Sequence, residues 1–99
     1  MGVGTNYVTG HAMERIRERW PSTSTLSHTR LLGYVAQAIQ HAQKRGEVVL
    51  APGGTYVPFT FGGEEGFLVI KKKSVVTAEG ADWCPEVAAY LEKIRNGQV

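Results

Sequence analysis

The feature that most constrains the fold is a change in the spacing of apolar residues at Gly46. Before this glycine, apolar side chains recur every three to four residues, the spacing of one helix face. They are Leu31, Val35, Ala38, Ile39 and Ala42. After it, the apolar run 48–50 and the alternating segment 55–61 have the spacing of strands. A chain with helices first and strands second favours an α+β fold, in which helices cover one face of a small sheet.

The segment 7–20 predicts the first helix. Thr9 is placed to cap its start, and Pro21 to end it. Residues four apart share one face of a helix, so two neighbouring rows follow. The row expected in the core is Ala12, Ile16 and Trp20. The row expected along the rim, held in place but open to solvent, is His11, Arg15 and Arg19.

A second helix and a small sheet complete the expected architecture. The second helix is expected to begin after a cap at Ser27 and to end at Gly46 in the left-handed conformation. Pro58 has no amide to donate, which predicts a strand at an edge or with a bulge. The whole is an α+β fold: two N-terminal helices packed on a small, mostly antiparallel four-stranded sheet, plus a C-terminal helix over 84–96 that begins near Pro85. The expected strands are 48–50, 55–61, 67–73 and 75–79, with a hairpin loop at 62–66.

Chain length and composition predict a single domain over 1–99. A chain of 99 residues buries only about two-thirds of its unfolded surface and cannot divide its core in two. Residues 1–6 are small and polar, and we expect a loose N-terminus. No apolar run approaches the ~18 residues of a membrane span, and no secretory signal is evident, so a cytoplasmic protein without membrane contact is expected. Cys84 is the single cysteine, so it cannot form an intrachain disulfide and is expected to be an inert, partly buried thiol.

One short string resembles a known family. The run Val-Thr-Gly-His-Ala-Met-Glu-Arg-Ile-Arg-Glu-Arg, from Val8 to Arg19, places a His-Ala dipeptide before arginines four and eight residues after the histidine. It resembles the start of small bacterial and phage proteins of the DUF4258 kind. These are similar in layout to the RelE-like ribonuclease toxins, which also run two helices and then an antiparallel sheet. The resemblance covers about a tenth of the chain and implies a RelE-like fold, with RNA as the substrate or partner. The helix after Glu79 is a departure from that layout.

The rim of the first helix carries the candidate catalytic residues. Cleavage of RNA by the ribose 2′-hydroxyl needs a group that moves a proton and positive charge near the phosphate. His11 and Arg15 are the candidates for these two tasks, because histidine titrates near neutral pH and arginine binds phosphate bidentately. In the alternative interpretation His11 helps to cap the helix, and the arginines pair with Glu14, Glu18 or the C-terminal helix.

Four further residues are candidates for RNA binding, namely Arg19, Lys71, Lys73 and Tyr56. In a strand, Lys71 and Lys73 would share one face and Lys72 would take the other. These lysines could equally protect a sheet edge from pairing. Tyr56 could orient a substrate on the open face of the sheet, although aromatic residues are also ordinary components of strands.

No metal site and no cofactor are expected. The three histidines have no close spacing to one another or to carboxylates, and His28 and His41 are expected on the solvated edges of the second helix. Two functions from different classes therefore remain. One is a metal-independent RelE-like endoribonuclease or RNA-binding protein. The other is a non-enzymatic protein of phage type, an inhibitor for example, which contacts a host protein or nucleic acid through its arginine row.

Overall fold

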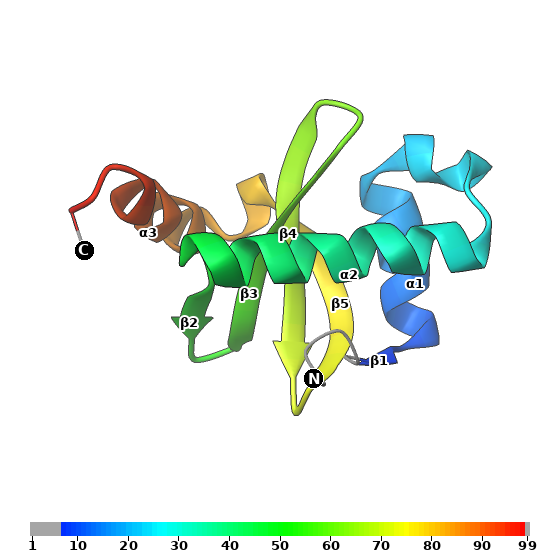
Figure 1. The fold of residues 1–99 in the computed structure, drawn as a ribbon, viewed down its shortest axis with the longest axis horizontal. Coiled ribbons are helices and arrows are strands. Elements are labelled where there is room, and N and C mark those ends of the chain that lie inside the picture. The colour runs from blue at the N-terminus through cyan, green and yellow to red at the C-terminus, as the bar shows by residue number, and fades with distance from the viewer. Residues whose placement is uncertain (1–6, 99) are drawn as a thin grey trace.

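The computed structural model describes residues 7–98 and has three α-helices around a five-stranded mixed sheet (Figure 1). The expected α+β class is confirmed; the expectation for residues 1–6 lies outside the described residues. In chain order the elements are β1 (Tyr7–Val8), α1 (Gly10–Arg19), the 3-10 helix η2 (Pro21–Thr25), α2 (His28–Arg45), β2 (Val49–Ala51), β3 (Gly54–Phe61), β4 (Glu64–Lys71), β5 (Ser74–Gly80), the 3-10 helix η3 (Ala81–Trp83) and α3 (Pro85–Arg95).

The sheet has the order β1-β5-β4-β3-β2. Strands β2 to β5 form an antiparallel meander, as the sequence predicts. The first strand, β1, is added parallel to β5, with Tyr7 opposite Ser74. The expectation of a four-stranded, mostly antiparallel sheet is therefore corrected: the sheet has a fifth strand, β1, and this strand pairs in parallel with β5. With only two residues, β1 is too short to show the alternation that identifies a strand.

The helix ends are set by local capping, as expected. The Thr9 hydroxyl accepts a hydrogen bond from the Ala12 amide at 3.0 Å, and the Ser27 hydroxyl accepts one from the Arg30 amide at 3.2 Å. Gly46 ends α2 with φ of 69°, a conformation that favours glycine. The segment that begins at Pro21 forms the 3-10 helix η2.

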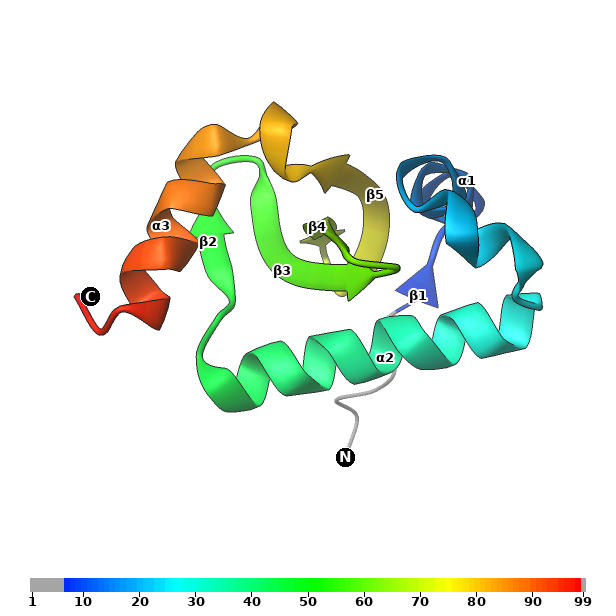
Figure 2. The same cartoon turned by 90° about the horizontal axis from the view of Figure 1, so that it is seen from above.

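The main core lies between one face of the sheet and the first two helices. Helix α1 packs on β5 and α2 packs on β3, and Figure 2 shows α2 running across the sheet with α1 beside it. Trp20 stands edge-on to Phe59, with ring centroids 4.8 Å apart, and its indole N–H donates to the Glu64 carbonyl at 2.8 Å. Ile16 and Trp20 share this core with the stripe of α2, as expected.

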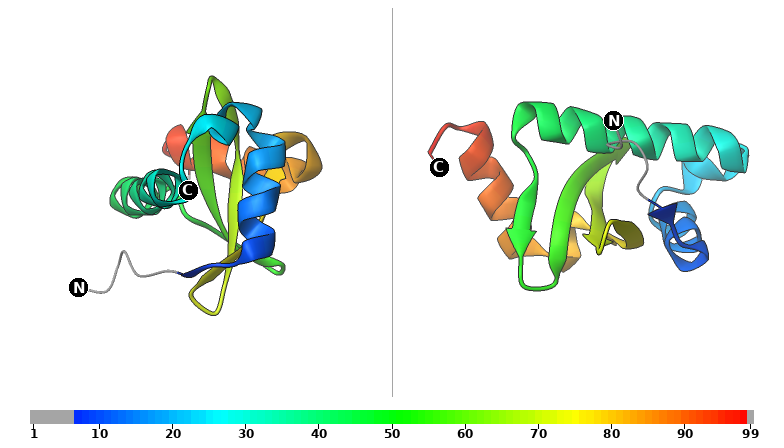
Figure 3. Two further views of the ribbon diagram at one scale, coloured as in Figure 1. Left: turned by 90° about the vertical axis from the view of Figure 1, so that its right-hand side faces the viewer. Right: turned by 60° about the horizontal axis from the view of Figure 1, so that its bottom comes forward.

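A second, smaller core lies on the opposite face of the sheet. Adjacent strand residues point to opposite faces, and Leu68 belongs to the main core while Phe67 belongs to the smaller one. The buried members of the smaller core are Val49, Phe67, Val87 and Leu91, so it is closed by α3. Figure 3 shows α2 and η3 on opposite sides of the sheet. Helices therefore cover both faces, which corrects the expectation that they cover one.

The hairpin between β3 and β4 is tighter than the sequence suggests. The expected loop at 62–66 shrinks to Gly62 and Gly63, with φ of 61° and 84°, and β4 already begins at Glu64. Such a two-residue turn with positive φ matches the twist of the strands it joins. Strand β2 pairs only with residues 54–56 of β3, so Pro58 lies where β3 is an edge strand, as predicted.

Cys84 should react slowly with alkylating reagents in the native protein. Its thiol is half-buried and donates to the Gly80 carbonyl at 3.4 Å. Burial raises the pKa of this thiol, the Glu79 carboxylate raises it further and Arg19 lowers it. Because only the thiolate reacts, iodoacetamide at neutral pH should label the native protein several-fold more slowly than the urea-unfolded protein. Equal rates in the two states would contradict the burial of this thiol.

Candidate nucleic-acid interface

His11 stands exposed at the start of α1. It is the second residue of that helix, and within residues 7–98 its side chain makes no hydrogen bond and no ion pair. The cap of α1 is supplied by the Thr9 hydroxyl. The alternative in which His11 itself caps the helix is therefore not observed. The imidazole is free to meet a ligand, but it lies outside the hollow lined by Tyr34 and His41, the one lined by Arg19 and Trp83, and the one lined by Leu50 and Tyr90.

Lys71, Lys72 and Lys73 form the turn between β4 and β5. Strand β4 ends at Lys71 and β5 begins at Ser74. Lys72 and Lys73 have φ of 50° and 66°, the left-handed values of a two-residue hairpin turn. The expectation that Lys71 and Lys73 share one strand face while Lys72 takes the other is therefore wrong. All three side chains are exposed, and Figure 1 shows that the turn protrudes at one end of the sheet.

The lysine turn is joined directly to the start of α1 through β1. The Tyr7 amide donates to the Lys73 carbonyl at 3.3 Å, and the Thr9 amide donates to the Val75 carbonyl at 3.1 Å. Helix α1 begins at the next residue and has no acidic residue in its first turn. We call this surface the lysine end and define it as the lysine turn (71–73) together with His11 and the first turn of α1.

The arginines of α1 have partners within the protein. Arg15 pairs with Glu18, one turn along the same helix, at 3.2 Å; this is one of the pairings that the alternative interpretation foresaw. Arg17 donates to the Thr23 carbonyl at 2.7 Å and so fixes η2 to α1. Three side chains were expected to lie open to solvent along this rim of α1, namely His11, Arg15 and Arg19. Because the arginines have partners within the protein, the three do not form one surface of unpaired positive charge.

Arg19 lies at the far end of α1 from His11, in surroundings that are mainly acidic. Its guanidinium is 3.8 Å from the Glu79 carboxylate and 5.3 Å from the centre of the Trp83 ring. Ten residues of helix span about 15 Å, so Arg19 is far from the lysine end. The expected pairing with the C-terminal helix is replaced by a contact with β5 and η3.

Tyr56 is also separate from the lysine end. It stands edge-on to Phe67 at 6.2 Å between ring centroids and packs against the smaller core beneath α3. Its face of the sheet is therefore covered at this position, whereas the sequence suggested an open face. Of the six predicted site residues, His11, Lys71 and Lys73 belong to the elements that β1 links at the lysine end.

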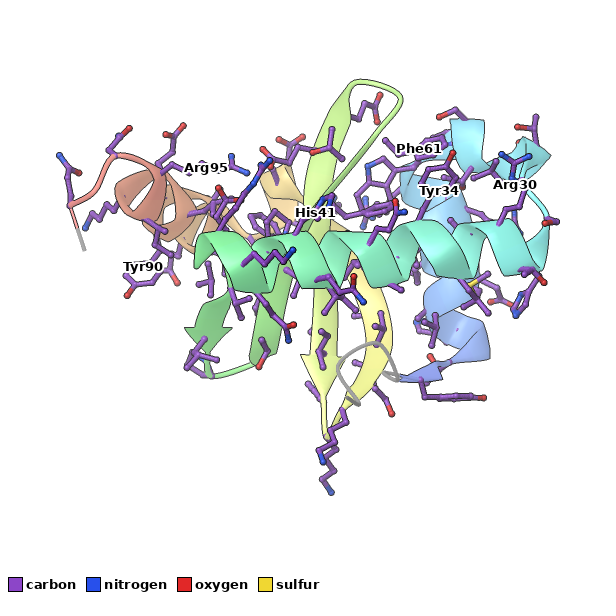
Figure 4. All side chains as sticks on the ribbon, viewed as in Figure 1. Arg30, Tyr34, His41, Phe61, Tyr90 and Arg95 are labelled. Carbon is purple, nitrogen blue, oxygen red and sulfur yellow. The ribbon has the colours of Figure 1, made fainter. Side chains whose placement is uncertain are left out.

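Sequence reasoning missed a charged cluster beside α2. Arg95 of α3 lies 2.8 Å from the Glu65 carboxylate and 3.3 Å from that of Glu47, and hydrogen bonding to Glu65 raises the pKa of Arg95. The cluster borders a hollow of about 230 Å³ that His41 also lines; Figure 4 shows His41 on α2 and Arg95 reaching from α3. No sequence signal links residues so distant along the chain.

Within residues 7–98 no group of three or more His, Cys, Asp or Glu side chains is placed to hold a metal ion. In the same range, no helix combines the length and the apolarity needed to cross a membrane. No protein-family model, curated protein or solved structure matches the chain.

Proposed function

We propose that this protein binds RNA through its lysine end. The observation that carries the proposal is the protruding turn of three consecutive exposed lysines, none of which pairs with a carboxylate among residues 7–98. When lysine ammonium groups neutralise the phosphates of a nucleic acid, the counterions condensed on it are released into solution, and this release favours binding. The unpaired amides in the first turn of α1 add positive potential beside the lysines. A net charge of +2 is small, so binding depends on this local surface.

The order of elements supports RNA as the nucleic acid. Two helices followed by antiparallel strands is the layout implied by the resemblance of residues 8–19 to proteins with a RelE-like arrangement. A shared layout does not by itself carry a shared activity. The resemblance therefore supports only the choice of RNA in this proposal, and the lysine end is the surface proposed to contact it.

Metal-independent cleavage of the bound RNA is the second candidate function. It is favoured by one observation: His11 is exposed at the lysine end and makes no hydrogen bond within residues 7–98. In this proposal His11 takes the proton of a ribose 2′-hydroxyl as that oxygen attacks the neighbouring phosphorus. The bond from phosphorus to the 5′-oxygen breaks, which leaves a 2′,3′-cyclic phosphate, and the departing 5′-oxygen takes a proton from water. The ammonium groups of Lys71 and Lys73 stabilise the charge that develops on the phosphate oxygens. Arg15, which pairs with Glu18, contributes only if the phosphate replaces that carboxylate.

Neutralising the lysine turn should weaken RNA binding and flatten its dependence on salt. The variant replaces Lys71, Lys72 and Lys73 with glutamine. Each phosphate contact on single-stranded RNA contributes about 0.7 to the slope of log affinity against log salt, so three lost contacts should reduce the slope by about 2. Fluorescence anisotropy of a labelled single-stranded RNA over a range of salt concentrations measures both quantities.

A matched variant separates this surface from general charge attraction. Lys44, Arg45 and Lys93 are three exposed cations away from the lysine end; replacing them with glutamine changes the net charge by the same amount. We expect this control to retain most of the affinity and of the salt slope. An equal loss in both triple variants would reject the lysine end as the binding surface.

A further inference from the structure

A second surface lies at the opposite end of β4 from the lysine turn. It is a hollow of about 400 Å³ between the end of α1, the start of β4 and η3. Its charged and aromatic lining residues are Arg19, Glu64, Glu65, Asp82 and Trp83. Strand β4 runs from Glu64 to Lys71, which at a rise of ~3.3 Å per residue places the two surfaces roughly 20 Å apart. This distance exceeds the Debye length of about 8 Å, so a ligand at one surface has little electrostatic effect at the other.

Trp83 is the unusual feature of this hollow. Its side chain is 70% exposed, although large aromatic side chains are normally buried in a protein of this type. The Arg19 guanidinium lies over the Trp83 ring, 5.3 Å from its centre, so the indole already makes one cation–π contact. The remaining exposed surface of the ring offers the same chemistry to a ligand.

The carboxylates that line the hollow determine whether a positively or a negatively charged ligand can bind there. Three of them line it, against the single guanidinium of Arg19. Arg95 binds Glu65 from outside the hollow, whereas Glu64 and Asp82 are exposed and have no ion pair within residues 7–98. Phosphate groups would be repelled here, and a cation would be attracted.

We propose that the Trp83 hollow binds an arginine-bearing, basic segment of a protein partner. A guanidinium can stack on the indole face and donate bidentate hydrogen bonds to a carboxylate, which the compact ammonium of lysine cannot do. Exposed Trp83 would then be the central anchor, and Glu64 and Asp82 would supply the charged contacts around it. The protein would thus carry a polyanion-binding end and, about 20 Å away, a surface for a basic protein partner.

Intrinsic fluorescence makes this surface directly observable. The chain has two tryptophans; Trp20 is 2% exposed and Trp83 is 70% exposed. Quenching by acrylamide therefore reports mainly on Trp83. A hexa-arginine peptide should shield Trp83 from acrylamide, and a hexalysine peptide should bind several-fold more weakly.

Three variants test which residues bind the peptide. Replacing Trp83 with alanine, or Asp82 and Glu64 with asparagine and glutamine, should weaken hexa-arginine binding about tenfold when it is measured by calorimetry. The matched control replaces Glu86 and Glu92, two exposed carboxylates of α3, with glutamine and should bind as the parent does. All these side chains are exposed, so the fold should be retained.

Two results would overturn the proposal. One is equal weakening in the Glu86/Glu92 control and the Asp82/Glu64 variant, which would show attraction to general negative charge. The other is protection of Trp83 from acrylamide by single-stranded RNA but not by hexa-arginine, which would assign the hollow to nucleic acid.

Discussion

Replacing Gly66 with alanine should destabilise the protein by about 3 kcal/mol, the upper part of the usual range for overpacking a core. A Cβ at this position would lie 2.7 Å from the Glu79 carbonyl oxygen and 2.7 Å from Cζ2 of Trp20. The carbonyl belongs to the neighbouring strand, and the indole is fixed by its hydrogen bond to Glu64 at 2.8 Å and by its contact with Phe59. Neither neighbour can move without disturbing the main core. Urea denaturation monitored by circular dichroism measures the change.

A second glycine provides the matched control. Gly33 lies in α2, and a Cβ there would meet nothing within 4 Å. Alanine at an exposed helical position is favoured over glycine by about 1 kcal/mol, so Gly33→Ala should stabilise the protein. Opposite signs for the two substitutions would show that close packing at Gly66 decides the result. A Gly66→Ala variant as stable as the parent would mean that Trp20 does not pack on β4 as described.

The helix limits were predictable because they are set by local interactions. Thr9, Ser27 and Gly46 act on backbone groups within four residues of themselves, so the sequence around each of them is sufficient. The edge position of Pro58 was predictable for a similar reason, since the missing amide is a property of the residue itself.

Features that depend on distant parts of the chain could not be predicted in the same way. Strand β1 forms only because Tyr7 and Val8 pair with β5, which lies more than sixty residues later in the chain. A segment of two residues is too short to show the alternation of apolar and polar residues that indicates a strand. The position of α3 depends on Phe67 pointing away from the main core, which gives that face of the sheet its own apolar cluster. Periodicity identifies an apolar stripe on a helix but not the sheet face that buries it.

In the candidate site, the residue types could be predicted from the sequence but their positions in the fold could not. The residue types suited to binding phosphate were evident at His11 and in the lysine run. The turn at Lys72 and Lys73 was not, because it lacks the glycine or asparagine that usually marks left-handed turn positions. The partners of the arginines were only partly foreseeable: Arg15 meets Glu18 on its own helix, whereas Arg19 meets Glu79 only after β5 has packed beside α1.

Replacing His11 with glutamine should lower the rate of RNA cleavage by about 10² to 10⁴, the usual contribution of a general acid or base. Glutamine keeps a hydrogen-bonding side chain but cannot transfer a proton at neutral pH. His11 is exposed, so folding and RNA binding should change little. Cleavage of a labelled single-stranded RNA, and of RNA bound to ribosomes, should be measured with excess chelator. Chelator should have no effect on the parent, because no metal takes part in the proposed step.

His28→Gln is the matched control, since His28 is also exposed but stands at the start of α2. It should cleave as the parent does. The lysine-turn variant should lose binding and cleavage together, whereas His11→Gln should lose cleavage alone. Cleavage that survives in His11→Gln would remove the histidine from the mechanism. RNA that stays intact with the parent while still bound in a lysine-dependent manner would reject the cleavage step and leave binding as the function of the lysine end.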